Sequence, residues 1–451
     1  GPAVFAEGDS TEILLALASL VNSSAFRLLV SLQMAFGSYE VGVIQRTPIP
    51  RLTEEEILNL AMAARRFWHL KRTLDSVVET SHAFVLPSAL RSRIGHFDPS
   101  AIEAELEQIR EKVDEASFAL YGFSASDRVA AANPNTEALG RDELRMADSD
   151  DSPSSPADTR TELLSWSAGV VFGRFEHRLA MGQTTAQIEV EPFDSLPAKS
   201  PGMLPDGAEP FHHHSGVLVD DPGHVHDIPR LMEEVLAQVT LPVPTDVRSW
   251  LKREFFPFHL QSYSKSRRKA PIYWPLTTTT GSYTLWLYYP KVSAQTLYVA
   301  VNDFIEPKLE QVSLDTSRLR DKGSLRTRDD EKQFELLQAF ELEIIELRDA
   351  LLNLAPTYKP NQDDGVQICA APLWPLFRHK PWQKILKETW TKLEKGDYDW
   401  AHMAMNYWPS RVREKCRSNE STAIAHGLEH LYAEPAARSE RQGIKMAGDS
   451  E

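Results

Sequence analysis

Residues 263–288 read YSKSRRKAPIYWPLTTTTGSYTLWLY and carry the strongest local signals for structure in the chain. Its second half contains two runs rich in strand-forming residues, 272–274 and 283–288, on either side of Gly281 and Ser282. Such runs around a short glycine-containing turn predict a β-hairpin. The first half places four cations within residues 265–269. The stretch therefore predicts a small β-structure that is preceded by a basic loop.

The basic loop contrasts with the rest of the 451-residue chain, whose formal net charge is -15. Arg and Lys donate to phosphate oxygens and exposed Tyr or Trp rings stack on bases, so their combination is typical of a polynucleotide-binding surface. The acidic remainder would repel DNA at long range, so any DNA contact has to be local. A solvated loop ahead of an ordinary buried strand is the alternative. The residues predicted to bind DNA here are Tyr263, Ser264, Lys265, Ser266, Arg267, Arg268, Lys269, Tyr273, Trp274 and Tyr283.

A second basic cluster lies between residues 378 and 417 and ends in the sequence WPSRVREKCR. The four cations in its last seven residues could hold a phosphate backbone. Equally, they could form the exposed face of a final helix. From this cluster we predict DNA contacts by Arg411, Arg413 and Lys415.

Helical periodicity dominates the N-terminal region. Residues 11–36 predict a helix that is interrupted near 22–24, followed by a strand at 39–44. Thr53 and the three glutamates after it predict a capped helix start, and we expect that helix to reach about residue 80. A second helix, from about 99 to 121, is expected to pair with it in antiparallel fashion.

Changes in composition divide the chain into parts. Residues 129–161 are rich in Ala, Asn, Asp, Ser and Pro, which predicts a disordered linker because they cannot bury enough apolar area. We expect a helical hairpin at 53–128, an α+β recognition region at 162–320, a helical C-terminal domain at 321–430 and a flexible tail at 431–451. The predicted fold class is mostly α with α+β parts: helical domains plus a small β-containing DNA-recognition region, in a multidomain chain.

The most periodic segment spans residues 326–354. Two sets of apolar residues recur there at heptad spacing, namely Leu337, Ile344 and Leu351, and Phe340, Leu347 and Leu354. A long helix that packs within its own domain is the favoured interpretation, because the heptads are few. An intermolecular coiled coil is the alternative.

Composition also indicates the compartment. The only two cysteines, Cys369 and Cys416, provide neither a disulfide framework nor a cysteine–zinc module. No signal peptide or membrane span is recognisable, since the apolar run at 13–20 is short and has polar flanks. We expect a cytoplasmic protein. The opening Gly1-Pro2 resembles the remnant of a tag-removing protease site, and we expect the chain to begin inside a longer parent protein.

Catalytic motifs do not occur in the sequence. A methyltransferase needs a glycine-rich turn for its cofactor and an Asn-Pro-Pro-Tyr box, of which Asn133-Pro134 matches only the first two positions. No phosphate-cradling loop or nucleophile elbow is present either. We therefore assign no catalytic residue and predict no cofactor in this chain.

Two polar groups allow other chemistry. The five histidines between 212 and 226 could offer imidazole ligands to a metal, but the glycines and prolines among them favour a surface loop, and we predict no metal site. The acidic pairs at 363–364 and 397–399 could serve as general acid and base or as nuclease ligands. Capping of a turn or helix is the favoured interpretation of both pairs.

Three passages together resemble one family. LASLVNSSAF at 17–26, YEVGVI at 39–44 and PIP at 48–50 resemble the end of the TaqI-like specificity domain of DNA adenine methyltransferases, which would occupy residues 1–52. The second passage is YSKSRRKAPIYW at 263–274 with GSYTLW at 281–286. The third is GDYDWAH at 396–402 with WPSRV at 408–412 and AIAHGL at 423–428. The last two are similar to the C-terminal half of the large single-chain methylases of phage-defence systems, the PglX-like proteins of BREX and their DISARM counterpart.

This resemblance implies a parent that uses S-adenosylmethionine to methylate the exocyclic amine of adenine in a short asymmetric site, marking host DNA as self. The family's cofactor and catalytic motifs are expected upstream of Gly1, so this chain alone should be inactive. A methylase must flip its base, and a separate module has to read the groove edges. In that scheme Arg267 or Arg268 reads guanine, Lys265 and Lys269 hold phosphate, and the loop and hairpin of 263–289 insert into a groove or against the backbone.

The predicted partners are double-stranded DNA, the catalytic methyltransferase domain of the parent and other phage-defence proteins, without a membrane. Two further functions stay open at this point. One is a protein-interaction platform that assembles defence components, which is motivated by the acidic balance, the helix at 326–354 and the tryptophan-rich end. The other is a fragment of a methylase–nuclease fusion, which rests on the acidic pairs alone.

Overall fold

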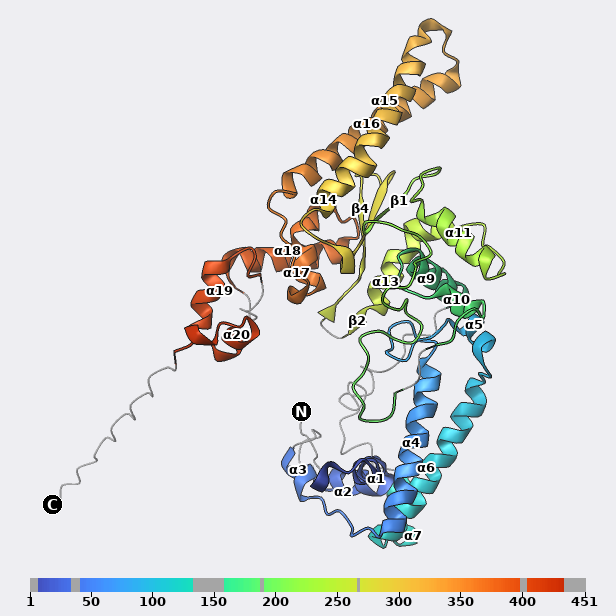
Figure 1. Ribbon diagram of the computed structural model, residues 1–451, viewed down its shortest axis with the longest axis vertical. Coiled ribbons are helices and arrows are strands. Elements are labelled where there is room, and N and C mark those ends of the chain that lie inside the picture. Colours follow the sequence, from blue (N-terminus) through green and yellow to red (C-terminus); the bar gives the residue numbers. More distant parts are fainter. Residues whose placement is uncertain are drawn as a thin grey trace, which may run out of the picture. The chain divides into compact units, whose positions relative to one another are not determined.

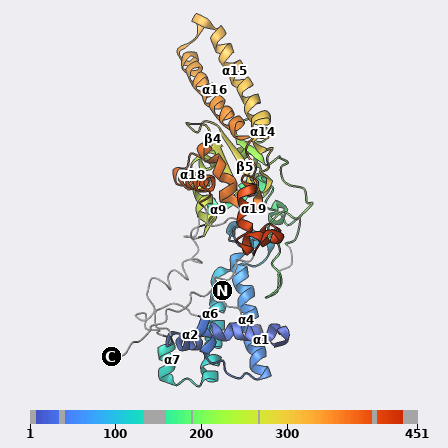
Figure 2. The ribbon, with the colours of Figure 1, turned by 90° about the vertical axis from the view of Figure 1, so that its left-hand side faces the viewer.

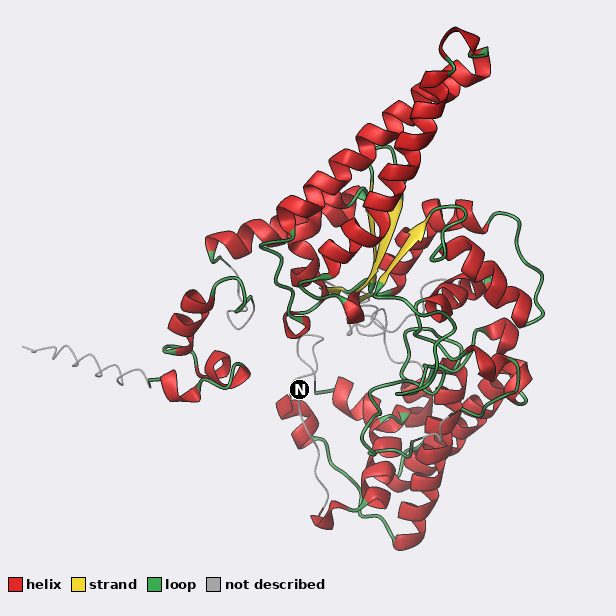
Figure 3. Ribbon diagram, turned by 45° about the horizontal axis from the view of Figure 1, so that its top comes forward, coloured by secondary structure: helices red, strands yellow, loops and turns green. Residues whose placement is uncertain are grey.

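The computed structural model of the protein describes residues 7–33, 41–132, 158–186, 190–265, 268–397 and 404–433. These residues are mostly helical and include a small three-stranded antiparallel sheet and a two-stranded ribbon, which confirms the prediction of a mostly α fold with α+β parts (Figure 3). The chain divides into two compact units. The first comprises residues 1–214 and 226–268, and the second comprises 215–225 and 269–451. Most of the predicted linker and tail lies outside the described residues.

The N-terminal helices of the first unit begin at side-chain caps. Helix α1 (Thr11–Val21) starts after Ser10 and α2 (Ser24–Ser31) after Ser23, and both serines accept from a backbone amide of the first turn. The predicted interruption near residues 22–24 is therefore confirmed. Among the described residues no single helix is long and apolar enough to cross a membrane; only α1 and α2 taken together meet that test, and they bend by 64° at the break.

The strand predicted at 39–44 is wrong over its described part. Helix α3 (Val41–Arg46) occupies this place, and the two residues before it lie outside the described part of the chain. A strand without a neighbouring strand leaves its backbone groups unpaired, whereas a helical turn pairs them locally. Thr47 N–H, for example, donates to the carbonyl of Val43 at 3.1 Å.

Two long helices form the predicted hairpin of the first unit (Figure 1). Helix α4 (Glu54–Asp75) begins with a capping box between Thr53 and Glu56, and α6 (Pro99–Tyr121) begins at Asp98. Leu70 of α4 packs against Leu106 and Ile109 of α6. Helix α4 ends five residues earlier than expected.

One helix of the first unit is buried along most of its length. In α9 (Thr159–Val171) every residue from Leu164 onward is buried, so neighbours cover it on all sides. The other elements of the unit are α5 (Ser88–Arg91), α7 (Ala125–Ala132), α10 (His177–Ala180), α11 (Ile228–Gln238), α12 (Val247–Trp250), a π-helical turn (Leu251–Phe255) and α13 (Phe256–Ser262).

The second unit contains a three-stranded antiparallel sheet with the order β1–β5–β4. The predicted hairpin is confirmed, because β4 (Tyr273–Thr277) pairs with β5 (Thr284–Tyr288) across the turn at 278–283. On its other edge β5 pairs with β1 (Val217–Asp220). All five residues of the central strand are buried, so both faces of the sheet are covered.

Helices complete the second unit. They are α14 (Thr296–Val299), a π-helical turn (Ala300–Ile305), α15 (Glu306–Asp321), α16 (Arg328–Leu354), α17 (Val366–Ala370), α18 (Lys380–Lys395), α19 (Pro409–Cys416) and α20 (Glu420–Ala425). Helices α15 and α16 run side by side and extend beyond the sheet of their unit (Figure 2). The heptad residues Ile344, Leu347 and Leu351 are buried, so this seam packs within the unit, as the favoured interpretation predicted.

Candidate nucleic-acid interface

The basic loop folds into a two-stranded ribbon made of β2 (Ser264–Lys265) and β3 (Arg268–Lys269). Ser266 and Arg267 lie outside the described residues, and of Lys265 and Arg268 only the backbone is described. Lys269 is partly buried and makes no ion pair with any described residue. The chain passes from the first unit to the second within β3, after Arg268.

Tyr263, directly before the ribbon, is held in a polar cluster of the first unit. Its hydroxyl donates to a carboxylate oxygen of Glu79 at 2.8 Å, and Arg174 donates both to that oxygen, at 3.3 Å, and to the tyrosine hydroxyl. Ser165 donates to the other oxygen of Glu79 at 2.7 Å. The predicted role of Tyr263 in DNA binding therefore needs correction: its hydroxyl fixes the base of the ribbon.

The surroundings of this cluster explain its stability. The side chains of Arg174 and Glu79 are only 8% and 17% exposed, so each charge depends on the other. The ring of Tyr263 lies between the guanidinium of Arg174, at 5.1 Å, and the ring of His259, at 4.2 Å. Burial, together with the nearby Arg174, lowers the pKa of His259 well below its usual value. His259 is thus neutral near pH 7, and the cluster carries one balanced pair of charges.

Tyr273, Trp274 and Tyr283 belong to the core of the sheet, which corrects the prediction that their rings stack on bases. All three are at most 2% exposed. Tyr273 stacks on Tyr288, and the indole of Trp274 donates to the carbonyl of Pro271 at 2.7 Å. Burial raises the pKa of Tyr283 far above its usual value. The strand formers that made the hairpin predictable are the residues that the sheet buries.

The turn of the β4–β5 hairpin is fastened to helices of its own unit. The hydroxyls of Thr280 and Ser282 each donate to Glu343 of α16 at 2.7 Å. Arg378 donates to the carbonyl of Thr278 at 3.2 Å. The Glu343 carboxylate adds a negative charge beside this turn, which would weaken an approach of the turn to phosphate.

Arg411 of the second basic cluster forms hydrogen bonds within the fold. Its guanidinium donates to the carbonyls of Leu393 at 2.7 Å and Glu394 at 3.1 Å, and it lies over the ring of Trp408. These carbonyls belong to the last turn of α18, where backbone acceptors lack helical partners. Arg411 therefore caps α18 instead of offering a free charge to DNA.

Arg413 and Lys415, in contrast, are exposed and make no ion pair with the described residues. Sequence reasoning missed a related feature on α18. Lys380, Lys384 and Lys387 recur at intervals of four and three residues, which places them on one exposed face of the helix. That helical spacing was readable in the sequence. The second basic cluster thus has two exposed parts, the lysine face of α18 and the outer side of α19.

The histidines between residues 212 and 226 contact one another or a neighbouring glutamate. His212 and His226 lie 2.7 Å apart through their ring nitrogens, and His213 contacts Glu209. Burial, with the neighbouring His226, lowers the pKa of His212 to about 4. In the described part of the chain, no three His, Cys, Asp or Glu side chains are placed to hold a metal ion.

The acidic pairs lie at turns of the chain, as far as their residues are described. Asp363 and Asp364 form a short 3-10 turn in which Asn361 accepts from the Asp363 amide at 3.2 Å. Asp397 follows the left-handed Gly396 at the end of α18, and Asp399 lies outside the described residues. Turn formation accounts for the first pair.

No protein-family model matches the chain, and no curated protein matches it significantly.

Proposed function

We propose that this chain is the target-recognition and scaffolding part of a site-specific DNA adenine-N6 methyltransferase of a phage-defence system, and that it binds duplex DNA. The observation that carries the proposal is the basic ribbon of residues 264–269 in an otherwise acidic chain. A two-stranded ribbon has a width that the DNA major groove admits. Arg side chains on it would read guanine, and Lys side chains would hold phosphate.

Support also comes from how the ribbon is fixed. The cluster around Tyr263 holds the chain on its N-terminal side, and β4 continues the chain into the sheet on its C-terminal side. A reading element has to present its side chains in a defined orientation, because misplaced donors lose their hydrogen bonds to base edges. The cluster of the first unit supports such an orientation on the N-terminal side of the ribbon.

The exposed cations of α18 and α19 would extend the DNA surface. Residues 378–417 contain ten Lys and Arg against five Asp and Glu, although the whole chain is acidic. Arg413, Lys415 and the lysine face of α18 are suited to phosphate contacts that position the duplex without reading its sequence.

The test is a titration of labelled duplex DNA by fluorescence anisotropy at several salt concentrations. Each lost phosphate contact makes the negative slope of log K against log salt shallower by about 0.9. Lys265→Ala with Lys269→Ala should therefore make this slope shallower by about 1.8. Arg267→Ala with Arg268→Ala should abolish site-specific methylation by the intact parent. The matched control is Arg320→Ala with Lys332→Ala, which removes two exposed cations of α15 and α16. An unchanged slope in the lysine variant, together with unchanged methylation in the arginine variant, contradicts the proposal.

A second function, a platform for protein partners, is favoured by the charge of α16. This helix carries eight Asp and Glu against three Lys and Arg, and its exposed residues include Leu336 and Leu342. An acidic surface with exposed leucines repels DNA and suits a protein partner.

A further inference from the structure

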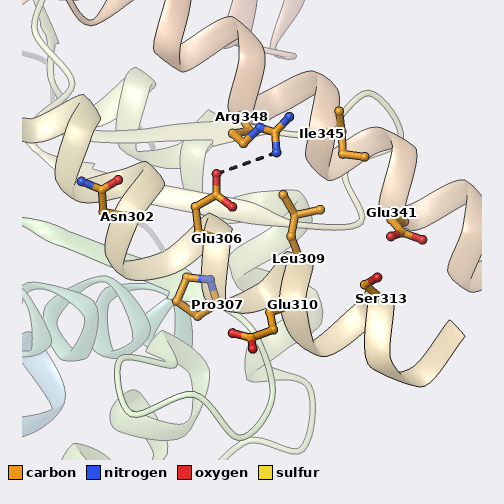
Figure 4. Close-up of a pocket in the computed structure, with 9 residues that line it drawn as sticks. All are labelled: Asn302, Glu306, Pro307, Leu309, Glu310, Ser313, Glu341, Ile345 and Arg348. Atoms are coloured by element: carbon orange, nitrogen blue, oxygen red, sulfur yellow. Dashed lines mark ion pairs between the residues drawn. The ribbon is translucent and has the colours of Figure 1, made fainter. Parts of the chain in front are cut away.

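A groove runs along one side of the α15–α16 pair in the second unit (Figure 4). Its lining residues come from the end of the π-helical turn and from both helices: Asn302, Glu306, Pro307, Leu309, Glu310, Ser313, Glu341, Ile345 and Arg348. All of them lie within one compact unit. The groove is therefore a property of that unit alone.

The groove lies on a different edge of α16 from the one that contacts the hairpin turn. Glu343 projects from the other edge and accepts hydrogen bonds from the hairpin turn. Glu341, Ile345 and Arg348 recur at intervals of four and three residues and so share the groove edge. Contacts with the sheet turn thus leave this edge of α16 open.

The groove combines an apolar floor with unneutralised carboxylates. Leu309 and Ile345 form the floor, and three carboxylates line it. The single cation of the lining, Arg348, lies 3.8 Å from Glu306 and 2.9 Å from Asp349. Glu310 and Glu341 make no ion pair with any described residue, so the lining keeps a net negative charge.

The two helices that line the groove also carry exposed leucines. Leu314 follows Glu310 by one helical turn and is 53% exposed, and Leu342 is adjacent to Glu341 and is 63% exposed. Single exposed leucines are ordinary, but two beside an acidic groove with an apolar floor enlarge an apolar surface that a partner could cover.

We propose that this groove binds an amphipathic helix of a partner protein, whose contacting face alternates Leu- or Ile-like side chains with Lys or Arg. Such a helix places apolar anchors at helical spacing on the floor and cations beside Glu310 and Glu341. A nucleic acid would be repelled by the carboxylates. A second copy of the chain docked through the same groove would bring like charges together, because a two-fold contact repeats the same patch on both sides. The proposal is independent of the basic ribbon.

The experiment uses the whole chain and a fluorescein-labelled helical peptide of Leu and Lys at amphipathic spacing, with anisotropy as the readout. A peptide of the same pattern with Glu in place of Lys is the ligand control. Glu310→Lys with Glu341→Lys should weaken binding of the Leu/Lys peptide roughly tenfold or more. The matched control Asp315→Lys with Glu335→Lys makes the same change of net charge on the same two helices, outside the groove lining. It should keep the affinity within about twofold of the original.

Three results would overturn the proposal. Equal losses in both reversal variants would mean general charge attraction, and absence of peptide binding would mean that no such helix fits. Sedimentation velocity measures self-association of the chain. If the chain self-associates and Glu310→Lys with Glu341→Lys abolishes this, a second copy occupies the groove. Circular dichroism confirms folding of each variant. Duplex binding is measured on the same samples, so a failure of the helix-binding proposal is distinguished from a failure of the DNA-binding proposal.

Discussion

Replacing Glu79 by Ala tests whether the cluster behind the ribbon is the buried ion pair described above. The substitution removes the carboxylate that accepts from Tyr263, Ser165 and Arg174. The Arg174 guanidinium, which is only 8% exposed, would then lose its ion pair with Glu79. Breaking a buried pair by deleting one partner costs about 3–5 kcal/mol.

The lower end of that range applies here because Glu79 keeps 17% exposure. A cost of about 3 kcal/mol corresponds to a roughly 150-fold rise in the opening equilibrium of the first unit. Hydrogen exchange followed by mass spectrometry measures this opening locally. Protected amides in peptides that cover residues 164–174 and 256–265 should exchange faster by about that factor, while peptides of the second unit keep their rates.

Two further variants make the result decisive. Glu103→Ala removes an exposed carboxylate of α6 and should change exchange less than about twofold. Adding Arg174→Met to Glu79→Ala should recover part of the loss, because no unpaired charge stays buried. Two results would refute the ion-pair interpretation. One is a stability loss for Glu79→Ala no larger than that for Glu103→Ala. The other is a stability loss for the double variant that exceeds the sum of the losses for Glu79→Ala and Arg174→Met alone.

Two other predictions concern the second unit. Burial raises the pKa of Glu343, but donation from Ser282 and Thr280 outweighs it and brings the pKa below the usual value. The ionised group therefore stabilises the unit above the unfolded pKa and stops doing so as pH falls through the folded pKa. Glu343→Gln should cost about 1–2 kcal/mol in thermal unfolding at pH 7, and the cost should shrink as the pH is lowered below the usual carboxyl pKa. Arg411→Ala should lower the stability of the unit by about 1 kcal/mol because it uncaps α18, and hydrogen exchange should become faster at the C-terminal end of that helix. The same substitution should leave duplex affinity unchanged. Arg413→Ala with Lys415→Ala, in contrast, should weaken duplex binding. Weaker DNA binding by Arg411→Ala would contradict its assignment as a cap.

The parts of the fold that could be predicted from sequence are those set by neighbouring residues. The capping box at Thr53 and Glu56 involves residues three positions apart, and the β4–β5 hairpin joins strands through a short turn. The heptads of α16 predicted a buried seam, which α15 covers. The strand predicted at 39–44 failed because β-branched residues indicate a strand only where another strand can pair with it.

The candidate site was less predictable because its partners are distant in the sequence. The hydrogen bond between Tyr263 and Glu79 spans 184 residues, and the contacts of Glu343 with the turn span 61 and 63. No periodicity connects such residues. The sequence correctly drew attention to an unusual density of cations and aromatics, but it could not separate the side chains that serve the core from those that face solvent.

That separation changes the physical basis of the proposed DNA contact. With Tyr273, Trp274 and Tyr283 in the core and Tyr263 engaged with Glu79, these rings cannot stack on bases. The affinity of the ribbon for DNA would then rest on charge, which makes it steeply dependent on salt and only weakly selective by itself. Selectivity would have to come from arginines that reach base edges, since each bidentate contact discriminates by about 1–3 kcal/mol. A rigid base under the ribbon is what such contacts require, and the buried cluster around Glu79 is placed to provide it.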